Sequence, residues 1–80
     1  MSYFVYILLC QDGTFYTGCT KNVDDRTRLH LNGRGARYTR SHPPQKIIYT
    51  EQFATRSEAM KREISIKKLS HSQKARLANL

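Results

Sequence analysis

The sequence predicts an α+β fold in which a three-stranded antiparallel sheet is flanked by three helices. Two runs rich in aromatic and β-branched residues, 3–10 and 14–19, stand on either side of the break at 11–13. A third run of this kind covers residues 45–53, and a capping residue precedes each helical segment. Eighty residues suffice for a modest core, so we expect one domain over 1–80.

The loop of the first hairpin decides whether its two tyrosines meet. Side chains alternate between the faces of a strand, so a shift of one residue exchanges the faces. A two-residue turn would pair Leu9 with Tyr16 and would separate Tyr6 from Tyr16. A three-residue loop with Gly13 in the left-handed conformation pairs Tyr6 with Gly18 and brings both hydroxyl groups to one face. We predict this second register, with Gly18 leaving space opposite the ring of Tyr6.

The charge of the chain indicates a polyanionic partner. Lys and Arg number 14 against 6 Asp and Glu, which gives a formal net charge of +8. Nucleic acid is the expected partner, because Lys and Arg that neutralise its backbone supply most of non-specific binding. The alternative is a basic protein that is merely soluble. We expect no signal peptide and no membrane span, and we expect Cys10 and Cys19 to be free thiols in a reducing cytoplasm.

A short helix is expected directly after the hairpin. Asn22 is a good N-cap, two aspartates follow it in the first turn, and Gly33 stands where the helix should end. Arg26 and His30 are four residues apart and therefore share a face of this helix.

The segment 33–44 has no hydrophobic period and is predicted to be a basic loop. It combines arginines with an aromatic ring, and loops often carry function, so we interpret it as a phosphate-contacting surface. The alternative is a solvated loop whose tyrosine packs into the core. The residues expected to contact nucleic acid are Lys21, Arg34, Arg37, Tyr38 and Arg40.

The second helix is predicted to begin at the capping box of Thr55 and to continue through residue 69. Its broad apolar arc consists of Ala59, Met60, Ile64, Ile66 and Leu69. Glu63 falls near the middle of this arc, where a carboxylate requires a partner or a metal ion. An ion pair with Lys67, one turn further on, is the alternative. A capping box at 70–73 predicts a last helix that covers the sheet.

The order and spacing of these residues resemble the GIY-YIG nuclease superfamily, and in particular its small stand-alone branch. Val5-Tyr6-Ile7 stands at the GIY position and Tyr16-Thr17-Gly18 at the YIG position. Arg26 matches the helix arginine, with His30 one turn on, and Glu63 matches the metal-binding glutamate. The motif Gly-x-Gly-Ala-x-Tyr-Thr before the third strand also recurs, here over residues 33–39.

The resemblance implies metal-dependent hydrolysis of a nucleic-acid phosphodiester bond, with DNA favoured and repair or recombination as the setting. It implies that Glu63 holds one Mg²⁺ or Mn²⁺ ion and that Arg26 binds the scissile phosphate. Tyr16 would be the general base or would position the water, supported by Tyr6, and His30 would be a second base or a phosphate donor. Each of these residues taken singly also fits an ordinary structural role. A late asparagine near the metal is common in the family, and Asn79 is the candidate here.

Two further hypotheses remain open beside the endonuclease. One is a non-catalytic module that binds nucleic acid, and the other is a subunit that a larger protein partner recruits for targeting. We expect a monomer, although the sequence carries no direct signal for oligomeric state.

Overall fold

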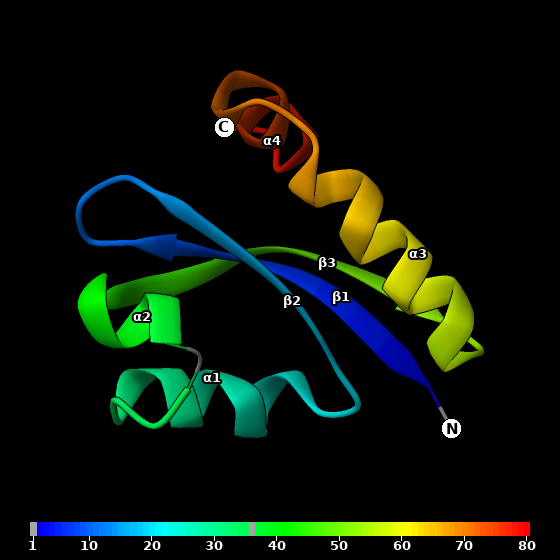
Figure 1. The fold of residues 1–80 in the computed structure, drawn as a ribbon, viewed down its shortest axis with the longest axis horizontal. Helices are drawn as coiled ribbons and strands as arrows, with labels where there is room; N and C mark the ends of the chain where they lie inside the picture. Colours follow the sequence, from blue (N-terminus) through cyan, green and yellow to red (C-terminus); the bar gives the residue numbers. More distant parts are fainter. Residues whose placement is uncertain (1, 36) are drawn as a thin grey trace.

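The computed structural model describes residues 2–35 and 37–80 and has the predicted α+β fold (Figure 1). One antiparallel sheet has the strand order β2-β1-β3, with both β2 and β3 paired to the central strand. The elements in chain order are β1 (Tyr3–Cys10), β2 (Phe15–Thr20), α1 (Val23–Leu31), α2 (Arg37–Ser41), β3 (Pro44–Phe53), α3 (Arg56–Lys67) and α4 (His71–Leu77). Ala36, a member of the motif noted above, lies outside the described residues.

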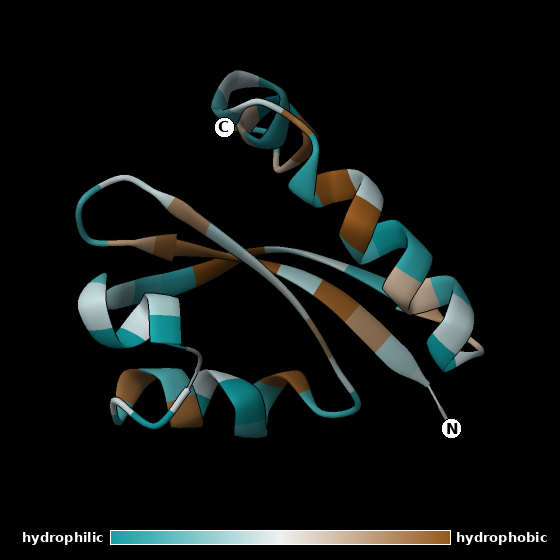
Figure 2. Cartoon of the chain, in the orientation of Figure 1, coloured by the Kyte–Doolittle hydropathy of each residue, from teal (hydrophilic) through white to brown (hydrophobic). Residues whose placement is uncertain are grey.

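The central strand β1 carries most of the buried apolar surface. Val5, Ile7 and Leu8 are each 0% exposed, and Figure 2 shows the brown of hydrophobic residues concentrated along β1 while the helices are largely teal. β1 has a neighbour along each edge and helices over both faces, as expected for a continuous apolar run.

The first hairpin has the predicted register. Tyr6 pairs with Gly18, Leu8 pairs with Tyr16, and the backbone N–H of Cys10 donates to the carbonyl of Thr14 at 2.8 Å. The turn is closed by Gly13, whose φ of 85° lies in the left-handed region that glycine adopts without strain. The three-residue loop therefore puts the side chains of Tyr6 and Tyr16 on the same face of the sheet.

Helices cover both faces of the sheet, and Figure 1 shows α1 and α2 on one side with α3 on the other. The α3 face holds the apolar core, in which Val5 and Ile7 pack with Ala59 and Ile66. The opposite face, beneath α1 and α2, buries polar groups: the side chains of His30 and Thr39 are 1% and 2% exposed. The two layers therefore divide the protein into an apolar core and a polar, aromatic side.

All three predicted helix starts are confirmed by their capping hydrogen bonds. The side chain of Asn22 accepts from the backbone N–H of Asp25 at 3.0 Å, and that of Thr55 accepts from the N–H of Glu58 at 3.2 Å. At Ser70 both arms of the capping box form. These local signals place the helix starts because they satisfy backbone N–H groups that have no partner inside the helix.

The prediction of a continuous loop over 33–44 is wrong for its central part, where residues Arg37–Ser41 form the one-turn helix α2. Thr39 on this turn is buried and bonded to His30 of α1. A five-residue helix is too short to show an apolar period in the sequence. Its stability comes from such contacts with the rest of the fold.

Two predictions about the later helices are also corrected. Met60 and Ile64, placed in the apolar arc of α3, are 45% and 54% exposed, so the buried stripe is narrower than the arc. The last helix covers the sheet only in part: none of its residues is fully buried, but Leu77 is half-buried and packs against the apolar core. It also contacts the hairpin: the ring of His71 stacks on Phe15 at 4.2 Å, and its Nε2 lies 2.8 Å from the carbonyl oxygen of Gly13.

Both cysteines are free thiols, as predicted. Among the residues that the structure describes, no helix combines the length and the apolar character that crossing a bilayer requires.

Candidate active site

The two motif tyrosines lie next to each other beneath α1. Their ring centroids are 6.2 Å apart. Tyr6 is 1% exposed, and its ring lies directly over Gly18 on the paired strand. A Cβ atom built on Gly18 would come within 2.6 Å of Cζ of Tyr6. The absent side chain at Gly18 is therefore what allows the ring of Tyr6 to extend across β2.

His30 completes a cluster of three rings with these tyrosines. Its Nε2 atom lies 2.9 Å from the hydroxyl of Tyr6, and its ring centroid is 5.3 Å from that of Tyr16. His30 is the one buried residue of α1. A helix that buries a histidine rather than an apolar side chain indicates a role beyond packing.

The other side of the His30 ring is held by the motif segment that follows α1. Nδ1 of His30 lies 2.7 Å from Oγ1 of Thr39. Gly35 packs against the same ring, so closely that a Cβ atom there would lie 2.7 Å from the histidine Cγ. Both ring nitrogens are thus engaged inside the protein, and the tautomer decides which of the two hydroxyl partners donates.

Burial keeps this cluster electrically neutral. Burial first, and the neighbouring Tyr16 second, raise the pKa of Tyr6 above its ordinary value of 10.0, so its hydroxyl keeps its proton. Burial also lowers the pKa of His30 below 6.5, and the positive charge of Arg26 lowers it further. A neutral imidazole paired with a protonated phenol is therefore the state expected at neutral pH.

A second stack of rings continues from Tyr16 to the protein surface. Tyr38 of α2 stacks on Tyr16 with a centroid distance of 6.0 Å, and the ring of His42 lies 4.0 Å from that of Tyr38. Tyr38 and His42 are both half-buried. The tyrosine of the predicted basic loop is thus neither free in solvent nor part of the apolar core, because it packs at the rim of the ring cluster.

The helix α3 carries two half-buried charged residues, Arg62 and Glu63, between its buried positions Ala59 and Ile66. Arg62 turns toward β3, where its Nε lies 3.1 Å from both carboxylate oxygens of Glu51. Glu63 is the next residue and lies about 100° further around the helix, so it faces the other flank, toward β2. Its carboxylate is half-buried and forms an ion pair of 2.7 Å with Nζ of Lys67. The ion pair considered from the sequence is therefore present.

The charges of Glu63 and Arg26 act on the same two residues, Tyr6 and Cys19, from helices on opposite faces of the sheet. Glu63 raises the pKa values of both Tyr6 and Cys19, whereas Arg26 lowers both, each as a contribution smaller than that of burial. Such effects require the charges to lie near the affected groups. Arg26 and Glu63 therefore both lie within electrostatic range of Tyr6 on β1 and Cys19 on β2.

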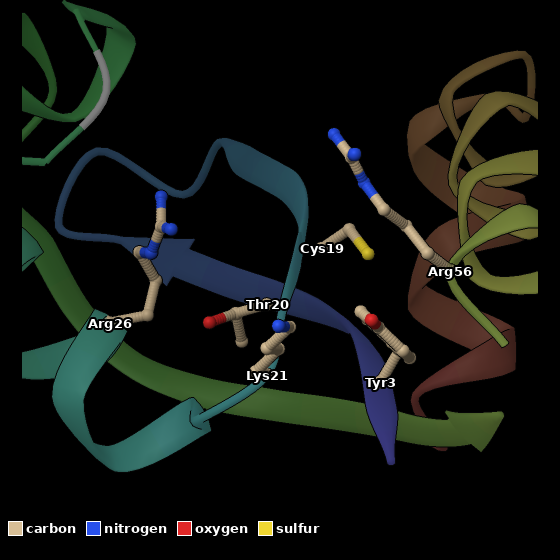
Figure 3. A pocket seen from close by; sticks show the side chains of 6 residues that line it. All are labelled: Tyr3, Cys19, Thr20, Lys21, Arg26 and Arg56. Carbon is tan, nitrogen blue, oxygen red and sulfur yellow. The ribbon is translucent and has the colours of Figure 1, made fainter. Parts of the chain in front are cut away.

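A cavity of about 310 Å³ opens beside Cys19 of β2. Figure 3 shows Arg26 on one side of Cys19 and Arg56 on the other, with Lys21 below them. The residues that line this space are Tyr3, Cys19, Thr20, Lys21, Arg26 and Arg56. Its charged groups are all cationic, so it suits an anionic ligand.

The remaining predicted residues lie away from this cavity lining. Arg34 and Arg37 are exposed, and Arg40 lines a separate cavity of about 280 Å³ beside His30 and Thr39. Asn79 is exposed after the end of α4, in the left-handed conformation with φ of 61°, where its N–H donates to the carbonyl of Arg76. The structure thus gives Asn79 a local role in ending the helix.

Four residues of the site were not assigned a role from the sequence: Gly35, Thr39, Tyr3 and Arg56. Gly35 and Thr39 belong to the motif before the third strand, so the motif itself was the available signal. Arg56 follows the N-cap of α3 and Tyr3 begins β1. No local pattern marks either as a neighbour of Arg26, because the three come together only in the folded sheet.

One oxygen donor suits the metal expected from the sequence. A carboxylate such as that of Glu63 fits a hard divalent cation that keeps most of its water ligands. Within residues 2–35 and 37–80, no group of three or more His, Cys, Asp or Glu side chains is arranged to hold a metal ion. The donor set is therefore compatible with a cation bound through a single carboxylate, in competition with Lys67.

Comparison with known proteins agrees with the motif and the fold. The family model described as the GIY-YIG catalytic domain matches residues 2–76. A UPF0213 protein of Staphylococcus saprophyticus is 44% identical over 75 residues, which cover 94% of this chain and 92% of the relative. The UPF0213 protein BH0048 of Halalkalibacterium halodurans is 44% identical over 80 residues, covering 100% of this chain and 85% of the relative.

Two solution NMR structures share the fold. That of the UPF0213 protein BH0048 from Bacillus halodurans has a TM-score of 0.62 at 43% identity, and the match covers 99% of this chain and 84% of the other. That of the protein EF2693 from E. faecalis has a TM-score of 0.64 at 47% identity, covering 95% and 81%. The chain therefore belongs to the GIY-YIG family of nuclease domains, among the small proteins designated UPF0213.

Proposed function

We propose that this protein is a divalent-metal-dependent endonuclease that hydrolyses nucleic-acid phosphodiester bonds. We favour DNA as the substrate, in repair or recombination, with residues 1–80 acting as one monomeric nuclease domain in the cytoplasm. The observation that carries the proposal is the cluster of Tyr6, Tyr16 and His30, with Arg26 and Glu63 close enough for their charges to act on Tyr6.

Tyr16 is the residue best suited to take the proton of the attacking water. It is half-buried, whereas Tyr6 is almost fully buried and its raised pKa keeps its proton in place. General bases must reach the proton that they remove, and Tyr16 is the more accessible hydroxyl of the pair. Tyr6 and His30 then act on Tyr16 by holding its ring, which makes them positioning residues.

Arg26 is assigned to the scissile phosphate. It is exposed on α1 and lines the basic cavity at the edge of β2. The planar fork of a guanidinium matches two phosphate oxygens and stabilises the charge that develops on them during hydrolysis. The buried position of His30, with both nitrogens engaged, favours a supporting role over the direct phosphate contact that the resemblance implied.

Glu63 would hold Mg²⁺ or Mn²⁺ once its ion pair with Lys67 opens. When bound there, the cation would stabilise charge on the leaving oxygen. The nucleic-acid backbone on either side of the scissile phosphate would be contacted by the exposed cations Lys21, Arg34, Arg37 and Arg40. Tyr38 would contact it at the rim of the ring cluster.

A cleavage assay tests the proposal. Labelled single-stranded, flapped and branched DNA and matched RNA are incubated with Mg²⁺ or Mn²⁺ and with the wild type, Arg26→Ala or Glu63→Ala. We expect cleavage by the wild type that chelation abolishes and that each variant reduces at least about a hundredfold. Equal background from the wild type and Glu63→Ala would refute the endonuclease.

The alternative is a module that binds nucleic acid without cleaving it. The ion pair between Glu63 and Lys67 favours this candidate, because it occupies the one carboxylate assigned to the metal. Recruitment by a protein partner, for targeting, would use the exposed apolar side chains of Met60 and Ile64 on α3. Binding to nucleic acid should weaken steeply with salt, whereas binding through apolar side chains should not.

A further inference from the structure

We infer that Arg56 and Lys21 form a second phosphate subsite, which binds the backbone phosphate next to the one assigned to Arg26. The inference rests on the proposed function, because it assigns a second phosphate of the same substrate to the cavity that Arg26 lines. It adds Arg56, from the start of α3, to the residues that contact nucleic acid.

The cations that line this cavity, Lys21, Arg26 and Arg56, form no ion pair within the described residues. Three ion pairs occur in the part of the chain that the structure describes, and they join Arg28 to Asp25, Arg62 to Glu51 and Lys67 to Glu63. None of them involves Lys21, Arg26 or Arg56. Three uncompensated cations around one cavity of about 310 Å³ favour an anion there.

The arrangement of these cations separates two positions for phosphate. In Figure 3, Arg26 extends from α1 on one side of Cys19, and Arg56 extends from α3 on the other. The charges of both arginines lower the pKa of Cys19, although burial has the largest effect and raises it. Cys19 therefore lies within electrostatic range of both guanidinium groups, which belong to different helices and line the same cavity.

Lys21 is held toward Tyr3 and away from Arg26. Its Nζ lies 5.5 Å from the ring centroid of Tyr3, in a cation–π contact. Tyr3 lines the same cavity, at the end away from Arg26 (Figure 3). A lysine oriented in this way loses less side-chain freedom when it binds phosphate. Arg56 and Lys21 thus both line the cavity beside Arg26, where they are available to a neighbouring phosphate.

The test measures the salt dependence of binding to a single-stranded 16-mer of DNA without metal ions. We expect Arg56→Gln to weaken binding about fivefold to tenfold at 0.1 M salt and to lower the salt slope by about 1. Arg76→Gln is the matched control, since Arg76 is an exposed arginine on α4. Arg56→Lys should retain the slope, because it retains the charge. Circular dichroism checks that each variant is folded.

The outcomes distinguish this subsite from the nuclease activity. Equal losses for Arg56→Gln and Arg76→Gln would overturn the subsite, even if the wild type cleaves DNA. A loss confined to Arg56→Gln would support the subsite, even if no metal ion gives cleavage. In an active enzyme, we expect Arg56→Gln to raise KM with little change in kcat, since its contact is made before and during the reaction alike.

Discussion

The hydroxyl group of Tyr6 lies 2.9 Å from Nε2 of His30, and both side chains are 1% exposed. This contact joins the central strand of the sheet to α1 beside the second motif tyrosine. The GIY tyrosine is thereby bonded into the interior, while Tyr16 remains partly accessible. The two tyrosines are therefore unequal in burial.

Removing the hydroxyl of Tyr16 should affect the chemical step more than removing that of Tyr6. We expect Tyr16→Phe to lower kcat by about 10² to 10⁴ with little change in KM, as for loss of a general base. Tyr6→Phe should lower kcat less and should also lower the free energy of unfolding, because it leaves His30 without a buried partner. Single-turnover cleavage and urea unfolding measure the two effects. A larger kcat loss for Tyr6→Phe would reverse the assignment.

A methyl group at Gly18 should displace the ring of Tyr6. We expect Gly18→Ala to lower the free energy of unfolding by about 1–3 kcal/mol, because its Cβ would overlap the phenol. In a Tyr6→Leu background the same change should cost less than about 1 kcal/mol, since the ring is gone. Urea unfolding of the four proteins in this cycle provides the measurement. Equal costs in the two backgrounds would show that the ring is not the cause.

The stability of the protein should fall as the pH drops below the ordinary pKa of histidine. The pKa of His30 is below 6.5 in the folded state, so the unfolded chain takes up a proton that the folded protein does not. This contribution is fully present above about pH 6.5 and is lost as the pH falls through the lower, folded pKa. Urea unfolding between about pH 7.5 and pH 5 measures it.

The histidine responsible can be identified by substitution. His30→Gln should flatten the pH dependence of unfolding, because it removes the buried imidazole. An unchanged profile in His30→Gln would assign the effect to other groups.

Lys67 should compete with the divalent cation for Glu63. We expect Lys67→Gln to lower the Mg²⁺ concentration at half-maximal cleavage by about twofold to tenfold, because it removes the ion pair of 2.7 Å. Lys68→Gln is the matched control, because Lys68 is also exposed and lies next to Lys67 at the helix end. Identical Mg²⁺ dependence in the two variants would contradict the competition.

The register of the hairpin was predictable because it depends on one local choice. Gly13 closes a three-residue loop, and that loop length alone decides that Tyr6 and Tyr16 share a face. The helix starts at Asn22, Thr55 and Ser70 were predictable for a similar reason, since each cap satisfies N–H groups within its own turn.

The errors arose where tertiary contacts decide the structure. The helix α2 forms against His30 and has no apolar pattern of its own. On α3, the arc of apolar residues did not show that Met60 and Ile64 would remain exposed, because the buried stripe follows Ala59 and Ile66. The chemical roles given to Tyr16, Arg26 and Glu63 remain predictions until cleavage is measured.

The sequence by itself determined the α+β class, the hairpin register, the helix caps and the net charge of +8, because each follows from residues close together in the chain or from composition. Only the tertiary structure decided that Tyr6 is buried against His30 and that Arg26 and Arg56 line one cavity with Cys19. Both depend on how α1 and α3 pack on opposite faces of one sheet. Burial and charge at the edge of β2 arise from that packing, which no local pattern encodes.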